Sequence, residues 1–436
     1  MIDLDLAAAF ILFILFMALS LLLDISMLIP LVLGFVLFAG LAVRHGCSVR
    51  DVLRMAVKSL HTSLIVVSVM VLIGCLTGLW RLSGTVSYFV VMGVSLMPPA
   101  FFILAAFLLA AAMSFALGTS FGVTATAGVI LMSIAKAGNV DPVLSAAAVM
   151  SGVYVGDRGS PASSSANLVA ALTGTDMRQN VRIMLKAAIV PFLLSCLFYA
   201  LLSLKHPMQR SDSSTLLALT EGFTLGWYCL LPAVFMIVLP FCKVPVKIAM
   251  AISIVCAVAV AIGAQGCSFA ECIKAALAGY RAPSAELAAL LDGGGILSML
   301  EVCGILLISG TYGSIFQETG MLSGITGRID RIAEKTGRFP AMILLGIAAC
   351  CIFCNQTIGA IMQNQFAASL YSKDEKGQKM IDMENSVITL AGMVPWCIAC
   401  SVPLAMLGVG PGAIPFSFYL WLIPLWNLFL SFRKTK

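Results

Sequence analysis

The sequence predicts an all-α polytopic membrane protein built from two inverted repeats, and three observations lead to that prediction. The chain has 436 residues, of which 61% are hydrophobic and 11% charged, with a mean hydropathy of +1.05. Soluble globular domains do not have this composition. The apolar residues form runs of spanning length, and the two halves of the chain resemble each other weakly. The net charge of +6 lies in loops, where it reports topology and not nucleic-acid binding.

Eight apolar runs are long enough to cross a bilayer as helices. They fall near residues 6–23, 27–43, 62–80, 183–204, 223–241, 247–263, 293–310 and 413–431. The first run follows an acidic start (Asp3 and Asp5), so we expect a transmembrane helix and not a cleaved signal peptide. We divide the chain into a first repeat, 1–210, and a second repeat, 211–436.

The internal repeat is visible in two places. The stretch Gly46–Asp51 recurs as Gly266–Glu271, a shift of 220 (266 − 46). Further along the shift is 237, matching Phe102 with Phe339 and Gly122 with Gly359. An insertion around 283–290 accounts for the difference. Weak duplication of this kind is typical of transporter folds.

The basic residues predict that the repeats are inverted. Three basic positions of the first copy become alanine in the second: Arg44, Arg50 and Lys58 correspond to Ala264, Ala270 and Ala278. Conversely, the basic segment 328–338 corresponds to the uncharged 91–101, and the basic segment 178–186 corresponds to the uncharged 410–423. Because positive charge stays on the cytoplasmic side, each basic loop must have its counterpart on the opposite face.

Each half is predicted to contain a re-entrant hairpin and a broken helix, giving ten crossings in all. The first hairpin runs from about 99 to 137, with its tip at residues 118–122. The second runs from about 339 to 372, with its tip at residues 355–359. The broken helices are 142–172 and 383–409, the second interrupted near residues 394–396. Residues 81–97 are predicted to be a surface segment, matching a charged amphipathic segment near 320–336.

The first helix break has the sequence Gly156-Asp157-Arg158-Gly159-Ser160-Pro161-Ala162-Ser163-Ser164-Ser165-Ala166-Asn167. It places two charges between apolar segments, which is costly in hydrocarbon unless a polar cavity or protein surrounds them. Its glycines and proline stop the helix and free backbone groups to act as ligands. We therefore expect half of a solute site near the membrane midplane.

The residues predicted to bind substrate or ion are the polar and charged side chains of the tips and breaks. They are Thr119, Ser120, Asp157, Arg158, Ser160, Ser163, Ser164, Ser165, Asn167, Asn355, Gln356, Thr357, Asn364, Gln365, Glu384, Asn385 and Ser386. Within this set the Na⁺ candidates are Ser120, Asp157, Asn167 and Thr357. Oxygen atoms and freed carbonyls coordinate Na⁺, while half-helix N-termini hold anions. Any single serine or threonine here has helix packing as its alternative role.

The two charged residues of the motif have alternatives of their own. Asp157 is interpreted as a coordinating or proton-carrying carboxylate, with a structural ion pair as the alternative. Arg158 either docks a substrate carboxylate or forms an ion pair. Its candidate partners in the ion pair are Glu384, Glu301 and Glu318.

The cysteines and histidines do not predict a metal centre. Fourteen cysteines are scattered through apolar segments, and their two Cys-x-x-Cys pairs, 351/354 and 397/400, are expected to pack between helices. The three histidines form no ligand cluster. Because the chain shows no nucleophile–base pairing and no filter-like repeat, an enzyme or a channel is disfavoured.

At these motifs the sequence resembles the NhaC-type sodium/proton antiporter family, within the wider ion-transporter superfamily. The resemblance covers most of the chain and rests on residues 118–122, on Gly156–Arg158 with Ser160, Pro161 and Asn167, and on Pro395-Trp396. It implies alternating-access transport. The family includes Na⁺/H⁺ antiporters, a malate/sodium-lactate exchanger and proteins described as amino-acid transporters.

The chain departs from the family pattern at three positions where the antiporters carry a protonatable group. Ser164 stands in place of an aspartate, Asn364 begins what is otherwise an Asp-Gln pair, and Asn385 occupies the middle of a Glu-Asp-Ser run. Exchange of Na⁺ for H⁺ requires a carboxylate that swaps its proton for the cation. Asp157 and Glu384 remain as the bearers of that role.

The sequence thus predicts a secondary transporter, not an enzyme, that exchanges Na⁺ for H⁺ or for an organic solute. The alternative is a Na⁺- or H⁺-coupled carrier of amino acids or small carboxylates, with Arg158 and the hairpin tips holding the carboxylate. We expect no cofactor beyond the coupling ion, no nucleic-acid partner, and a location in a prokaryotic plasma membrane with both termini cytoplasmic. The partners are the lipid bilayer and a small ion or solute, with a homodimer left open.

Overall fold

A computed structural model describes residues 4–23, 25–209, 213–242, 244–319 and 326–434, and over these residues the chain is helical. The one β-pairing in these ranges is an isolated bridge between Tyr280 and Gly293. By length and composition, six helices of the described chain can cross a membrane, or nine if each sharply bent helix pair is one span. The protein is therefore an all-α polytopic membrane protein. The predicted count of ten crossings included residues 27–43, which form one of two shorter apolar helices.

The helices of the first half are α1 (Leu4–Leu22), α2 (Leu28–Arg44), α3 (Val49–Leu82), α4 (Thr85–Leu96), α5 (Phe102–Leu117), α6 (Ser120–Val123), α7 (Val129–Ala137), α8 (Pro142–Gly159), α9 (Ser164–Thr173) and α10 (Met177–Lys205). Those of the second half are α11 (Ser213–Gly222), α12 (Leu231–Phe241), α13 (Val246–Gly263), α14 (Phe269–Ala278), α15 (Ala285–Leu291), α16 (Leu300–Thr319), α17 (Thr326–Thr336), α18 (Arg338–Phe353), α19 (Gln356–Phe366), α20 (Lys376–Met383), α21 (Ile398–Leu407) and α22 (Phe418–Lys434).

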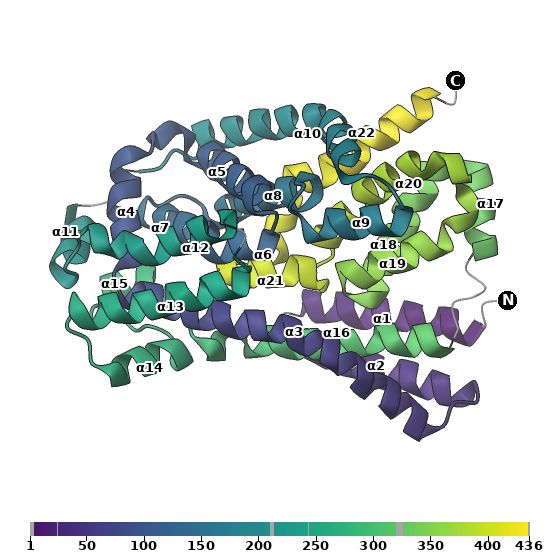
Figure 1. Ribbon diagram of the computed structural model, residues 1–436, viewed down its shortest axis with the longest axis horizontal. Coiled ribbons are helices and arrows are strands. Elements are labelled where there is room, and N and C mark those ends of the chain that lie inside the picture. Colours follow the sequence, from purple (N-terminus) through teal and green to yellow (C-terminus); the bar gives the residue numbers. More distant parts are fainter. Residues whose placement is uncertain (1–3, 24, 210–212, 243, 320–325, 435–436) are drawn as a thin grey trace.

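The duplicated loops lie at opposite ends of the molecule, as inverted repeats require. Ser48 caps α3 and Ser268 caps α14 with nearly the same backbone angles, and each hydroxyl accepts the amide of the third residue of its helix. In Figure 1, α14 lies at the left end, whereas the α2–α3 junction lies at the lower right. The matching short helices α4 and α17 are also separated, α4 at the left and α17 at the right. This placement is the one that inverted repeats predict.

The two re-entrant hairpins are present where the sequence predicts them. In the first hairpin, the amide of Met208 donates to the Pro99 carbonyl over 2.9 Å, and that of Gln209 donates to the Gly138 carbonyl over 2.8 Å. Both ends of the segment 99–138 are thus tied to one short loop, so the segment enters and leaves on the same side. In the second, an ion pair of 2.6 Å joins Arg338, at the start of α18, to Glu375, beyond the end of α19.

The tips of the two hairpins share one backbone geometry, and this geometry corrects the predicted register. Each first arm ends on a left-handed residue, Gly118 with φ +65° and Cys354 with φ +54°. The next residue caps the second arm with φ and ψ of −144° and 123° at Thr119 and −143° and 123° at Asn355. The structural shift is therefore 236 (354 − 118), not 237, because the turn geometry and not glycine identity defines equivalence.

The prediction of a surface segment at 81–97 is only partly right. The chain bends by 68° between the end of α3 and α4, at Gly84, whose φ is +76°. This bend folds α4 back, so that Val86 and Val90 are fully buried while Leu96 is exposed. Of the matching segment 320–336, the structure describes α17, and residues 320–325 lie outside the described residues.

Candidate functional site

In each half the hairpin tip is fixed to the helix break of the same half. In the first half, the Ser160 hydroxyl donates to the Phe115 carbonyl over 2.6 Å, and Gly118 packs so closely on Ala162 that a Cβ atom there would overlap its carbonyl. In the second half, the amide of Ile398 donates to the Cys354 carbonyl and the Trp396 indole to the Cys351 carbonyl, each over 2.9 Å.

The two halves meet through side chains of their tips and breaks. The Gln356 amide group donates to the Asp157 carboxylate over 3.2 Å, and the Arg158 guanidinium donates to the Asn385 side-chain oxygen. The Tyr154 hydroxyl donates to the Ala399 carbonyl over 2.8 Å. The predicted convergence of both tips and both breaks is therefore present, and the charges of the first break lie inside it.

Asp157 is the carboxylate on which three helix N-termini converge. It is 3% exposed and accepts hydrogen bonds from the Ser165 hydroxyl at 3.2 and 3.3 Å, in the first turn of α9. Ser120, the first residue of α6, lies beside the carboxylate. Gln356, the first residue of α19, completes the set. The positive ends of helix dipoles stabilise negative charge, so this arrangement suits an anionic carboxylate.

Arg158 is fully buried, and its partners come from three other elements: the π-helical turn at 384–388, α10 and α22. Its Nε lies 3.1 Å from the Asn385 side-chain oxygen, which also accepts from Nη2, and its Nη1 donates to the Met184 carbonyl over 3.2 Å. Tyr419 of α22 lies beside the guanidinium. Two of the predicted acidic partners are engaged elsewhere: Glu301 accepts from Ser26, and Glu318 pairs with Lys58 over 2.8 Å.

Glu384 is a second buried carboxylate of the junction, and it lacks hydrogen-bond partners. Its side chain is fully buried, and neither carboxylate oxygen has a donor in the described structure. Its electrostatic neighbours are Arg158 and Asp157. Glu384 opens a π-helical turn, Glu384–Ile388, a distortion that is frequent at functional sites.

The three charges of the junction sum to −1 when all are ionised. Arg158 remains protonated in proteins, so Asp157 and Glu384 share one resident positive charge. A buried cluster with net charge is costly in a low-dielectric interior. One monovalent cation or one proton therefore makes the cluster neutral.

Several predicted residues hold the backbone of the tips and breaks in place. Thr119 and Asn355 cap α6 and α19, and Ser163 caps α9 and donates to the Asp157 carbonyl. Ser160 bonds Phe115 as described, and the Ser386 hydroxyl donates to the Asp382 carbonyl over 2.6 Å. These hydroxyl and amide groups position the elements that carry Asp157, Arg158 and Glu384.

Other predicted residues lie outside the cluster. Ser164, Asn167 and Thr357 are exposed, and the Asn167 amide group donates to the Pro161 and Ser163 carbonyls. The Na⁺ candidates Ser120 and Asp157 are therefore brought together, whereas Asn167 and Thr357 are not. Asn364 and Gln365 lie in the last turn of α19, at the opposite end from Gln356, and Gln365 is exposed.

Gln363, which sequence reasoning missed, is the buried glutamine of this helix. Its amide group donates to the Met342 carbonyl over 2.7 Å and to the Ser386 hydroxyl over 2.9 Å, joining both arms of the second hairpin to the π-turn. The spacing of the glutamines in the sequence could have identified it. Gln356 and Gln363 are seven residues apart and therefore lie on one face of the helix, while Gln365 points elsewhere.

The two Cys-x-x-Cys pairs pack together at the second tip and break. Cys354, Cys397 and Cys400 are fully buried, and a side-chain hydrogen bond joins Cys350 to Cys397. In the described ranges, no group of three or more His, Cys, Asp or Glu side chains can hold a metal ion.

Comparison with known proteins identifies the family of the chain. The Na⁺/H⁺ antiporter family matches residues 4–166 and 152–432. The malate-2H⁺/Na⁺-lactate antiporter of Bacillus subtilis is 26% identical over 86% of this chain and 82% of its own length. The NhaC Na⁺/H⁺ antiporter of Alkalihalophilus pseudofirmus is 23% identical over 84% and 81%. The arginine/ornithine antiporter ArcD of Halobacterium salinarum is 25% identical over 74% and 69%. The chain therefore belongs to the Na⁺/H⁺ antiporter family and is a secondary transporter.

Proposed function

We propose that this protein exchanges Na⁺ for H⁺ at the cluster of Asp157, Arg158 and Glu384. The observation that carries the proposal is the net charge of −1 on two fully buried carboxylates and one fully buried guanidinium. Because a single positive charge neutralises the cluster, Na⁺ and H⁺ compete to supply that charge. Competition for one charge is the thermodynamic basis of one-for-one exchange.

The two carboxylates differ in what they can hold. Asp157 is surrounded by the hydroxyls of Ser120 and Ser165, so it supplies oxygen ligands for a small hard cation. Glu384 has no hydrogen-bond donor around it, an environment in which a neutral, protonated carboxyl is less costly than a carboxylate. We assign Na⁺ to Asp157 and the proton to Glu384. The positive charge of Arg158 acts on both carboxylates and so couples the two binding events.

The architecture supports alternating access of this site. Two inverted units bring their interrupted segments to one place, so rocking one unit against the other exposes the cluster to opposite sides in turn. The duplicated loops at opposite ends of Figure 1 are consistent with this movement.

We propose the plasma membrane of a prokaryote as the location, with both termini cytoplasmic. Both termini lie at the right end of Figure 1, which also carries α17 and the α2–α3 junction. The basic residues of these segments, Arg44, Arg50, Arg328, Arg331 and Lys335, belong to that same end. Positive charge retained on the cytoplasmic side supports this orientation.

An organic solute is the second candidate for exchange, and the names of two relatives favour it. One relative is named for malate and lactate and another for arginine and ornithine. Arg158, however, is held by Asn385 and by the Met184 carbonyl. A substrate carboxylate would have to displace these bonds, so Arg158 is a poor docking point and a carboxylate would bind elsewhere.

Exchange assays in proteoliposomes test the proposed ion site. An imposed pH gradient should collapse on addition of Na⁺ in the parent protein. Asp157→Asn and Glu384→Gln should each abolish this response, because either change leaves the cluster neutral without a cation. Asp374→Asn, an exposed carboxylate near α20, serves as the matched control and should keep it. Full Na⁺-dependent exchange in either buried variant would overturn the assignment.

A further inference from the structure

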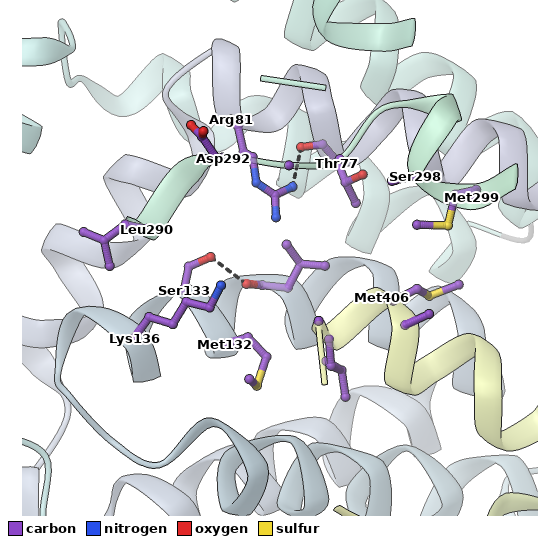
Figure 2. Close-up of a pocket in the computed structure, with 16 residues that line it drawn as sticks. Thr77, Arg81, Met132, Ser133, Lys136, Leu290, Asp292, Ser298, Met299 and Met406 are labelled. Carbon is purple, nitrogen blue, oxygen red and sulfur yellow. Dashed lines mark hydrogen bonds between the residues drawn. The ribbon is translucent and has the colours of Figure 1, made fainter. Parts of the chain in front are cut away.

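A second polar cavity lies away from the central cluster, at the end of the molecule opposite the termini. Its volume is about 170 Å³, and its walls come from the end of α3, from α7, from residues 290–294, from residues 298–299 and from the end of α21. Figure 2 shows Arg81 entering from one wall and Lys136 from the facing wall, with Asp292 beside Arg81. The central cluster uses none of these three residues.

A glycine turn present only in the second repeat builds this cavity. Gly293, Gly294 and Gly295 all have positive φ, of 121°, 75° and 81°, which favour glycine. The Gly295 amide donates to the Gly74 carbonyl of α3 over 2.8 Å, so the turn lies directly against that helix. The turn thereby places Asp292 next to Arg81, one helical turn beyond Gly78.

The cavity carries an excess of positive charge. Arg81 donates from Nη1 to the Thr77 carbonyl over 2.8 Å, while its Nε is buried without an acceptor. Asp292 accepts the amide of Ala282 over 2.7 Å. The ion pairs in the described part of the chain are Arg44–Asp5, Lys58–Glu318 and Arg338–Glu375, so neither Arg81 nor Lys136 is neutralised by direct pairing. Two cations against one carboxylate leave a net charge of +1.

We propose that this cavity binds a short organic monocarboxylate. An anion of charge −1 neutralises the site, and the Arg81 guanidinium and the Lys136 ammonium, which line the cavity from facing walls, offer charge-assisted hydrogen bonds to it. The remaining lining includes Met132, Met299 and Met406, which suit a small apolar body. The volume holds about six water-sized groups at about 30 Å³ each, which limits the ligand to a short chain.

The cavity and the central cluster lie along one helical segment. Residues 120–137 form one continuous helical segment, with Lys136 at its end and Ser120 at the tip beside Asp157. The cavity follows this segment from Lys136 to Val129, about 10 Å at 1.5 Å per residue, and the tip lies about 13 Å further. This inference goes beyond the exchange of Na⁺ for H⁺, because it adds an organic anion and a site for it.

Isothermal titration of the purified full-length protein with propionate, at constant Na⁺ and without an ion gradient, tests the site. Propionate should bind, whereas propionamide, the neutral analogue, and chloride should not. Arg81→Gln and Lys136→Gln should each weaken binding by about tenfold or more, as loss of a charge-assisted contact predicts. Asp292→Asn keeps the acceptor for Ala282 and should tighten binding. Lys274→Gln, at an exposed lysine of α14, should leave it unchanged.

The gain of affinity in Asp292→Asn keeps the test decisive should a cationic-residue variant fail to fold. Equal binding of propionamide or chloride would overturn the carboxylate assignment. Propionate binding insensitive to Arg81→Gln, Lys136→Gln and Asp292→Asn would overturn the site itself. Because the readout needs no exchange, this inference and the proposed ion exchange can fail separately.

Discussion

The two helix breaks have nearly the same backbone and different chemistry. Ser163, which caps α9, has φ and ψ of −67° and 131°, and Cys397, which caps α21, has −73° and 135°. Both helices have ten residues and end on a left-handed glycine, Gly174 and Gly408. The shift between them is constant at 234 (397 − 163 and 408 − 174). At the level of the backbone, each break repeats the other.

The charges do not follow this symmetry. With the shift of 234, Asp157 and Arg158 correspond to Ala391 and Gly392, while Glu384 corresponds to Met150. One break thus supplies an aspartate and an arginine, and the other supplies a glutamate seven residues before the position that matches Asp157 (391 − 384). The backbone is symmetric, whereas the charges are not, so the proposed exchange has one cation site and not two.

Removing Arg158 should have the largest effect on stability. Arg158→Gln leaves two buried carboxylates without their positive charge, which we expect to cost about 3–5 kcal/mol of unfolding free energy. Adding Glu384→Gln should restore part of it, because the charge of the cluster returns to −1. Denaturant or thermal unfolding in detergent measures both, with Arg178→Gln at an exposed position of α10 as the control. No restoration in the double variant would show that Glu384 does not share the charge of Arg158.

Equivalent turn positions in the two hairpins should respond differently to alanine. Gly118→Ala forces a left-handed alanine and overlaps the carbonyl of Ala162, so we expect a loss of more than about 2 kcal/mol. Cys354→Ala keeps the existing Cβ and removes only a buried sulfur, with an expected loss of about 1 kcal/mol. Thermal unfolding of both variants compares them, and equal losses would contradict the tight docking of the first tip.

A third comparison separates two glutamines of α19. Gln363→Ala removes the bonds to Met342 and to Ser386, which should cost about 1–3 kcal/mol and slow Na⁺-dependent exchange. Gln365→Ala, at an exposed position, should change neither stability nor exchange. The same unfolding and proteoliposome assays apply to both. A larger loss in Gln365→Ala than in Gln363→Ala would reverse the assignment of the functional face.

The helix interruptions and their charges were predictable because glycine, proline and ionised groups are conspicuous in apolar segments. Asp157, Arg158 and Glu384 are found in this way. The register of the second hairpin was harder to predict, because Cys354 adopts the left-handed turn that Gly118 adopts in the first. Aligning the two tips by residue identity therefore shifts the register by one residue.

Other parts of the site depend on tertiary packing that local sequence does not encode. The π-turn at Glu384–Ile388 carries no composition signal that separates it from an α-helix. The pairing of Gln356 with Asp157 joins residues 199 positions apart. The cavity beside Arg81 requires the glycine turn of the second repeat to reach α3 of the first, a contact that hydropathy does not reveal.

The bond between Gln356 and Asp157 has a consequence for how the transporter moves. Each tip is hydrogen-bonded to the break of its own half, whereas this bond joins the two repeats. In the proposed exchange, an ion bound at Asp157 competes with Gln356 for the same oxygen atom. Ion binding would then break this hydrogen bond between the two repeats, so that binding itself allows one repeat to move against the other.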